Sequence, residues 1–218
     1  MRLPVPKTIF RAHAVAWLYL AGFVLAEVIY AGLSPRDQAA ITTWASTNVH
    51  NLSHDPVDSL IASAFVTGAV VTAWPILIAL ALVGASAVLG NWRTAQVCAA
   101  GHVIGTLVSE GIVAYRVSRG QLPALDRYLT DVGPSYVVVS AIVVALLYGS
   151  WSARGAAALG LALLILVGNI FGGLSQLSVP AVGHLTAMTV AAGAGGLLVW
   201  RQRARSLSKD PAGAGRPG

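Results

Sequence analysis

Charged residues are scarce in this chain of 218 residues, because Asp, Glu, Lys and Arg make up only 10% of it and hydrophobic residues 56%. A soluble domain carries roughly 25% charged residues. The mean hydropathy is +0.72, and apolar runs about 20 residues long, enough to cross a bilayer, recur along the chain. These properties exclude an ordinary water-soluble domain and predict an all-α polytopic membrane protein whose surroundings are the lipid bilayer.

Cysteine is nearly absent. The single cysteine, Cys98, lies in an apolar run, which excludes an internal disulfide and a thiolate metal cluster and predicts a small buried residue. We expect no metal and no cofactor. The net charge of +6 does not indicate nucleic acid, because the basic residues lie between the apolar runs and at the two ends of the chain.

Six apolar segments are predicted to cross the membrane as helices. The first follows basic residues, as a secretory signal does, but it is too long for a signal core and is interpreted as a retained helix. Residues 1–205 form the predicted transmembrane domain, and residues 206–218, rich in Pro, Gly and Ala, form a predicted disordered tail. The segments are 11–32, 70–90, 95–116, 133–149, 155–172 and 180–200.

The distribution of positive charge predicts the orientation. Ten of the 14 Lys and Arg residues lie on the side that carries both termini, which places both termini in the cytoplasm. The long connection 34–69 then faces outward, and its residues 58–66 are predicted to form a short interfacial helix. A re-entrant or spanning helix within 55–69 is the alternative. The abundance of Ala, Gly, Val and Arg suggests a bacterial genome, and hence the plasma membrane.

Polar residues inside the predicted spans are candidates for function, because they are costly in lipid. His102, Thr106 and Glu110 are spaced by four and form one polar stripe on the third segment. Interhelical hydrogen bonds that fix the packing explain such a stripe, and a proton or ion path is the alternative. Glu27, near a helix end, is expected to have a structural role.

Ser135 and His184 open the fourth and sixth segments at the same predicted depth. Asp131 is predicted to cap the fourth helix, and Pro134 fits its first turn. His184 borders a ridge of small residues that lets another helix approach closely. A serine hydroxyl becomes a nucleophile when an imidazole removes its proton, so the two side chains form a candidate catalytic pair. The ridge consists of Gly183, Ala187, Ala191 and Gly195.

Together these features resemble the rhomboid family of intramembrane serine proteases, over roughly residues 10 to 200. Family members carry Gly-x-Ser-Gly in helix 4 and Ala-His in helix 6, and this chain has Gly133-Pro134-Ser135-Tyr136 and Gly183-His184. The resemblance implies a rhomboid-like bundle of six helices with a long first external loop. It further implies Ser135 as nucleophile, His184 as general base and then acid, and a transmembrane segment as substrate.

The chain departs from the family pattern at three places. Tyr136 replaces the glycine after the serine, Pro134 precedes the serine as in catalytically silent members, and no His-x-x-x-Asn opens the second segment. The candidates for lining the site or holding an oxyanion are His50, Asn51, His54, Gly133 and Tyr136. If the second span began near Asp55, His54 would take the oxyanion position; loop structure or capping is the alternative for the three loop residues.

Three functions follow as hypotheses. The first is an intramembrane serine protease that cleaves transmembrane segments with Ser135 and His184. The second is a catalytically silent rhomboid-like pseudoprotease that binds membrane clients. The third is a small transporter, channel or membrane assembly factor.

Overall fold

The computed structural model describes residues 10–68 and 73–208, and every regular element within these ranges is helical. Each of the six predicted segments corresponds to one long helix. Short helices fill the predicted external loop and the other connections. The long helices are α2 (Ala14–Ala31), α6 (Trp74–Leu89), α7 (Asn91–Ser118), α8 (Ser135–Tyr148), α9 (Trp151–Leu166) and α10 (Val179–Ser208). The short ones are α3 (Pro35–Ala45), α4 (Val49–His54), α5 (Pro56–Ser63) and the 3-10 turns η1 (Ala124–Tyr128) and η2 (Leu174–Gln176).

Helix length divides the long helices into two groups. By length and composition, α2, α7 and α10 can each cross a membrane, whereas α6, α8 and α9 are apolar but have only 14 to 16 residues. At about 1.5 Å per residue such helices are roughly 21 to 24 Å long, less than the roughly 30 Å of hydrocarbon. Ten of the 14 residues of α8 are buried, so this short helix is the centre of the bundle.

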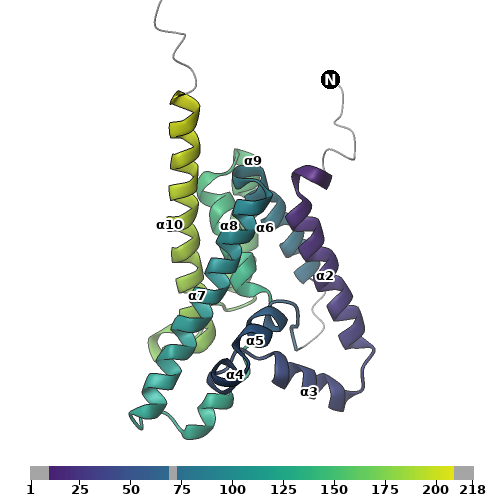
Figure 1. Ribbon diagram of the computed structural model, residues 1–218, viewed down its shortest axis with the longest axis vertical. Helices are drawn as coiled ribbons and strands as arrows, with labels where there is room; N and C mark the ends of the chain where they lie inside the picture. The colour runs from purple at the N-terminus through teal and green to yellow at the C-terminus, as the bar shows by residue number, and fades with distance from the viewer. Residues whose placement is uncertain (1–9, 69–72, 209–218) are drawn as a thin grey trace, which may run out of the picture.

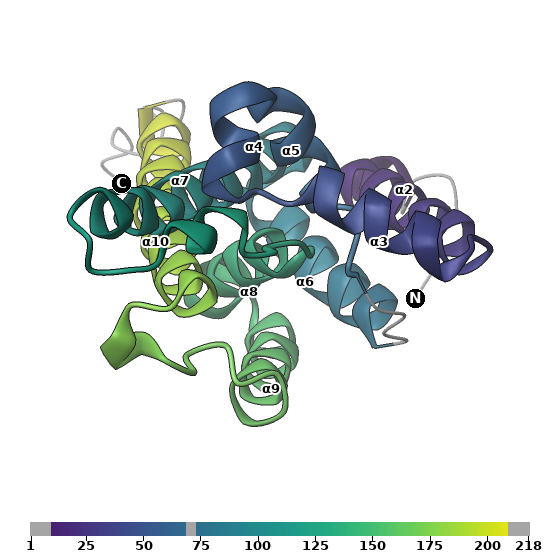
Figure 2. The same ribbon diagram turned by 90° about the horizontal axis from the view of Figure 1, so that it is seen from below.

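Figures 1 and 2 show how the helices surround α8. Seen from below, α6, α7, α9 and α10 lie around it, and α2 lies outside, against α6 (Figure 2). The start of α2 and the end of α10 lie at one end of the bundle, and α3 and α4 lie at the other (Figure 1). We call these the terminal end and the loop end. Ser135 and Val179, the first residues of α8 and α10, belong to the loop-end half.

Close packing between α7 and α10 depends on small residues. A Cβ atom on Gly105 would lie 2.9 Å from the carbonyl oxygen of Gly183, so any side chain there would push the two helices apart. Ala187 and Ala191 are fully buried. The ridge of small residues predicted on the sixth segment therefore packs against neighbouring helices, as expected of such seams in membranes.

The loop-end segments are fixed by caps and by contacts with the long helices. Ser34 caps α3 through a hydrogen bond from the Asp37 N–H to its hydroxyl, 3.2 Å. Asn48 caps α4 in the same way, 2.9 Å from the Asn51 nitrogen. Glu27 accepts a hydrogen bond from the Thr67 N–H at 3.1 Å, which ties the segment after α5 to α2.

Several predicted boundaries are wrong. The helix predicted at 58–66 is α5, which begins at Pro56 and has only eight residues, too short to span a membrane. The fifth helix ends at Leu166 rather than at 172, because Asn169 has a left-handed φ of 49° that a helix does not allow. It begins at Trp151, capped by Ser150, inside the predicted connection. Residue 70, the predicted start of the second helix, and residues 209–218 of the predicted tail lie outside the described ranges.

Candidate functional site

Ser135 and His184 lie at the start of two neighbouring helices, but no hydrogen bond joins them. The His184 Nδ1 atom is 3.1 Å from the carbonyl oxygen of Ile170. Because a carbonyl only accepts, Nδ1 carries the hydrogen and Nε2 has the free lone pair. That Nε2 atom is buried and has no hydrogen-bond partner. The imidazole therefore has the tautomer that a general base needs, without the serine that it would activate.

Tyr136 packs against the histidine. The two rings are edge-to-face, with centroids 5.0 Å apart and planes at 84°. A Cβ atom on Gly183 would overlap the ring and the hydroxyl of Tyr136. The hydroxyl lies 3.3 Å from Asp131 Oδ2 and 3.3 Å from the Val179 carbonyl oxygen. Tyr136 is thus a buried wedge between the first turns of α8 and α10.

Ser135 lines a small cavity that it shares with a different histidine, His102. The serine is half-buried, and the cavity has a volume of about 10 Å³. That volume holds about one water molecule. Gly133, which also lines it, has a left-handed φ of 133° and donates its N–H to the Ser63 carbonyl oxygen at 2.8 Å. The other lining residues are Thr47, Ser63, His102, Asp131, Val132 and Tyr136.

The polar stripe of α7 is buried along its whole length. His102 Nε2 lies 2.9 Å from the Leu60 carbonyl oxygen, so it donates there and connects α7 to α5. The other nitrogen of His102, the Thr106 hydroxyl and Glu110 Oε1 are buried without a hydrogen-bond partner. His102 thus makes an interhelical hydrogen bond, and the three unpaired atoms are polar positions whose burial costs free energy.

Asp131 has a different role from the predicted helix cap. The residue before α8 is Pro134, and no side chain caps this helix, so the capping prediction is wrong. The Asp131 carboxylate instead accepts from the Thr47 hydroxyl at 3.3 Å and from Tyr136. Burial raises the pKa of Asp131 above its ordinary value, and the two hydrogen bonds oppose that shift. No signal in the sequence relates Asp131 to Thr47, because 84 residues separate them.

The three loop candidates support the local structure of the loop end. The Asn51 amide donates to the carbonyl oxygens of Thr43 and Ser46, at 2.7 and 2.8 Å, and so completes the end of α3. His54 Nδ1 is 2.8 Å from the His50 carbonyl oxygen, and the His50 ring lies 4.8 Å from that of Tyr128. None of the three is among the residues that line the Ser135 cavity.

The described part of the chain contains no group of three or more His, Cys, Asp or Glu side chains that could hold a metal ion. The polar side chains gathered near Ser135 and His184 are hydroxyls, imidazoles and carboxyls: Ser135, Tyr136, His102, His184, Asp131 and Glu110.

The apolar helices and the polar groups buried among them define a multi-pass helical membrane protein. A family model described as "rhomboid-like protein" matches residues 8–204, and the chain belongs to that family. Neither the curated proteins nor the solved structures include a significant match to it.

Proposed function

We propose that this protein is a rhomboid-like pseudoprotease that binds transmembrane segments of client proteins without cutting them. In this proposal all six long helices cross the membrane and both termini are cytoplasmic, in line with the ten Lys and Arg residues on that side. The observation that carries the proposal is the Tyr136 wedge, which packs on His184 in place of the Ser135 hydroxyl.

The geometry around Ser135 argues against proteolysis. A general base must come within about 2.6 to 3.2 Å of the hydroxyl that it deprotonates, a distance that is often longer in apo sites and shortens when substrate binds. His184 Nε2 has no hydrogen-bond partner. The cavity at Ser135 has room for about one water molecule, not for a peptide carbonyl and its side chains. Pro134 before the serine matches the silent members of the family that the sequence resembles.

A cleft on the lipid-facing side offers a place for a client. It encloses about 300 Å³ between α2, α5 and α7, and its lining is apolar apart from Tyr19 and His102. A second hollow, of about 480 Å³, continues it along α2 toward Trp92. Figure 1 shows α2 and α7 diverging toward the loop end. On α7 the wall includes three small residues, Ala95, Cys98 and Ala99, beside His102 and Val103, and small residues permit close helix approach.

A serine-reactive fluorophosphonate probe tests the absence of catalysis. We expect equal background labelling of the wild type and of Ser135→Ala in the same membrane preparation, next to a strongly labelled active rhomboid protease. Labelling of the wild type that disappears in both Ser135→Ala and His184→Ala would instead establish the protease.

Cross-linking tests client binding. A photoreactive amino acid at Ala99 should cross-link to co-expressed single-span membrane proteins, and Ser135→Ala and His184→Ala should leave this unchanged. Tyr19→Ala, which alters the opposite wall, should change the yield. The same photoreactive group at Ile76, a residue 65% exposed on α6, is the control, and equal cross-linking at both positions would contradict the proposed cleft.

A further inference from the structure

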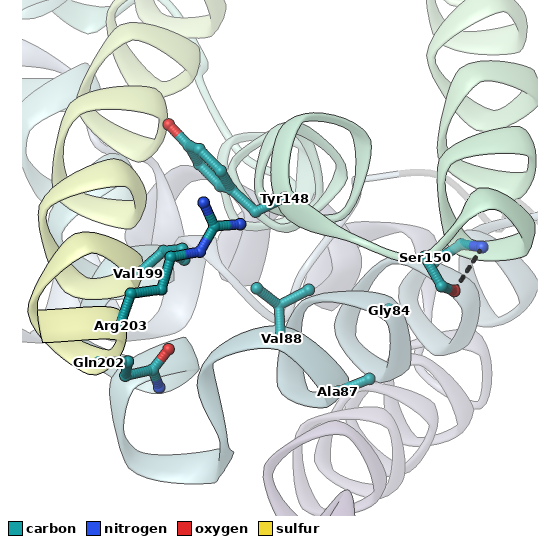
Figure 3. Close-up of a pocket in the computed structure, with 9 residues that line it drawn as sticks. Gly84, Ala87, Val88, Tyr148, Ser150, Val199, Gln202 and Arg203 are labelled. Carbon is teal, nitrogen blue, oxygen red and sulfur yellow. Dashed lines mark hydrogen bonds between the residues drawn. The ribbon is translucent and has the colours of Figure 1, made fainter. Parts of the chain in front are cut away.

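Another pocket lies at the terminal end of the bundle, away from Ser135 and His184. It has a volume of about 280 Å³ and lies between the last turns of α6, the turn from α8 to α9, and α10 (Figure 3). Its lining residues are Gly84, Ala87, Val88, Tyr148, Ser150, Ala153, Val199, Gln202 and Arg203.

The pocket has one cationic side. Figure 3 shows the Arg203 side chain reaching from α10 toward Tyr148 and Val88, across the pocket from Ser150. No hydrogen bond or ion pair to any other described residue engages its guanidinium, and no Asp or Glu is among the lining residues. The nearby Arg154 is already engaged, because it donates to the Leu147 carbonyl oxygen at 3.1 Å and lies 5.4 Å from the Trp151 ring.

The rest of the lining is largely apolar. Val88, Gly84 and Ala87 of α6 contribute to it, and Val199 lies beside Arg203 on α10 (Figure 3). The Tyr148 hydroxyl is used elsewhere, because it donates to the Ala192 carbonyl oxygen at 2.7 Å. The Ser150 hydroxyl is also used, because it accepts from the Ala153 N–H at 3.4 Å as the cap of α9. A ligand would therefore meet a charged and hydrogen-bonding rim, made of Arg203 and Gln202, and a hydrocarbon interior.

The depth of the pocket matches the membrane interface. Trp151 and Trp200, adjacent in sequence to Ser150 and Val199, are 86% and 66% exposed. Exposed tryptophans at helix ends are typical of the headgroup level of a bilayer. Basic pockets between transmembrane helices at that level bind anionic lipid headgroups, and the planar guanidinium of Arg suits a phosphate because it donates two parallel hydrogen bonds.

We propose that this pocket binds an anionic phospholipid from the leaflet at the terminal end. Arg203 binds the phosphate, Gln202 hydrogen-bonds the headgroup, and Val88 and Val199 hold the glycerol backbone and the first methylenes. The proposal requires only that the protein is in a membrane, and it does not depend on client binding or on catalysis.

Native mass spectrometry of the full chain in detergent tests the site with dioctanoyl-phosphatidylglycerol. Because the variant loses the charge-assisted hydrogen bonds to the phosphate, Arg203→Gln should weaken binding about tenfold. Arg201→Gln is the matched control: it removes the same charge from an exposed position two residues away that does not line the pocket, and it should leave the affinity within about twofold. Dioctanoyl-phosphatidylcholine should bind the wild type more weakly.

Three results would overturn the proposal. Equal losses in Arg203→Gln and Arg201→Gln would show general electrostatic attraction only. Inorganic phosphate that displaces the lipid at equal concentration would show a phosphate site rather than a lipid site. Unchanged binding in Val88→Trp, which fills the pocket without changing the charge, would place the lipid elsewhere. Each variant is compared with the wild type for its unfolding temperature, so that misfolding is not mistaken for lost binding.

Discussion

Tyr136 and Gly183 form a matched pair of residues at the junction of α8 and α10. The rhomboid pattern has a glycine after the serine and an alanine before the histidine. Here the larger Tyr136 stands in place of that glycine, and the smaller Gly183 stands in place of that alanine. The space that Gly183 leaves open receives the Tyr136 ring. The fold therefore accommodates the Tyr136 side chain. Its ring occupies the surface on which a catalytic serine and histidine would meet.

We expect Gly183→Ala to destabilise the protein by about 1 to 3 kcal/mol, because overpacking forces neighbours apart. The new Cβ would overlap the Tyr136 ring. Gly193→Ala on the same helix is the control, because nothing lies within 4 Å of a Cβ there. Thermal unfolding in detergent compares the two. If the clash is the cause, adding Tyr136→Ala should remove most of the cost of Gly183→Ala, and a purely additive double variant would contradict this reason.

Asp131 makes stability depend on pH. Its pKa is raised in the folded protein, chiefly by burial, so folding is favoured when the carboxyl is protonated. This contribution is present below the ordinary Asp pKa of about 3.9 and is lost as the pH rises through the folded-state value. At neutral pH the buried carboxylate therefore lowers stability.

Asp131→Asn should accordingly raise the unfolding temperature at pH 7 and have a smaller effect near pH 4. The amide oxygen can still accept from Thr47 and Tyr136, whose hydroxyls now contact Oδ2. Unfolding temperatures measured from pH 4 to pH 8 test this, with the exposed Asp58→Asn as the control for loss of an acidic residue. A variant that is less stable than the wild type at pH 7 would contradict the argument.

At the scale of helices, the contact of α7 with α10 depends on Gly105. A Cβ there would lie 2.9 Å from a backbone oxygen of α10, which cannot move aside as a side chain can. Gly105→Ala should therefore destabilise the protein by about 1 to 3 kcal/mol. Gly111→Ala on the same helix, with nothing within 4 Å, should be neutral or stabilising because alanine favours helix. Equal stability of the two variants would show that α7 and α10 do not pack closely at Gly105.

The helices were largely predictable from sequence because each requires a long apolar run, which hydropathy detects directly. The ends of the helices were less predictable. The left-handed Asn169 ends α9 early, and such a conformation in a residue other than glycine has only a weak sequence signal. The external loop was predicted to contain one short helix, but it contains three, α3, α4 and α5, because caps such as Ser34 and Asn48 start helices that are polar.

The candidate site was only partly predictable, and helix rotation is the reason. Adjacent residues on a helix point about 100° apart, so a short motif cannot tell whether Ser135 or Tyr136 faces α10. A one-sided apolar pattern would resolve this, but α8 is buried on all sides and apolar throughout. The sequence placed Ser135 and His184 near the starts of two helices, and the structure shows that Tyr136 contacts His184 while Ser135 shares a cavity with His102.

For the whole molecule, both proposed sites depend on which end of the bundle faces the cytoplasm. The client-binding proposal places the loop end outside the cell. The lipid proposal places Arg203 at the opposite end, in the leaflet that faces the cytoplasm if the positive-inside rule holds. One measurement of orientation therefore tests both proposals. Cysteine labelling is practicable because the chain has a single cysteine, Cys98, to replace first.

In a Cys98→Ser background, single cysteines can be placed at Ser118, exposed at the end of α7, and at Ser150, exposed before α9. A membrane-impermeant maleimide added to intact cells should label Ser118→Cys and should label Ser150→Cys only after the membrane is opened. The physical reason is that the two residues lie at opposite ends of the bundle, with the hydrocarbon between them. Labelling of both from outside would contradict six crossings, and the reverse pattern would invert the molecule and place the Arg203 pocket in the outer leaflet.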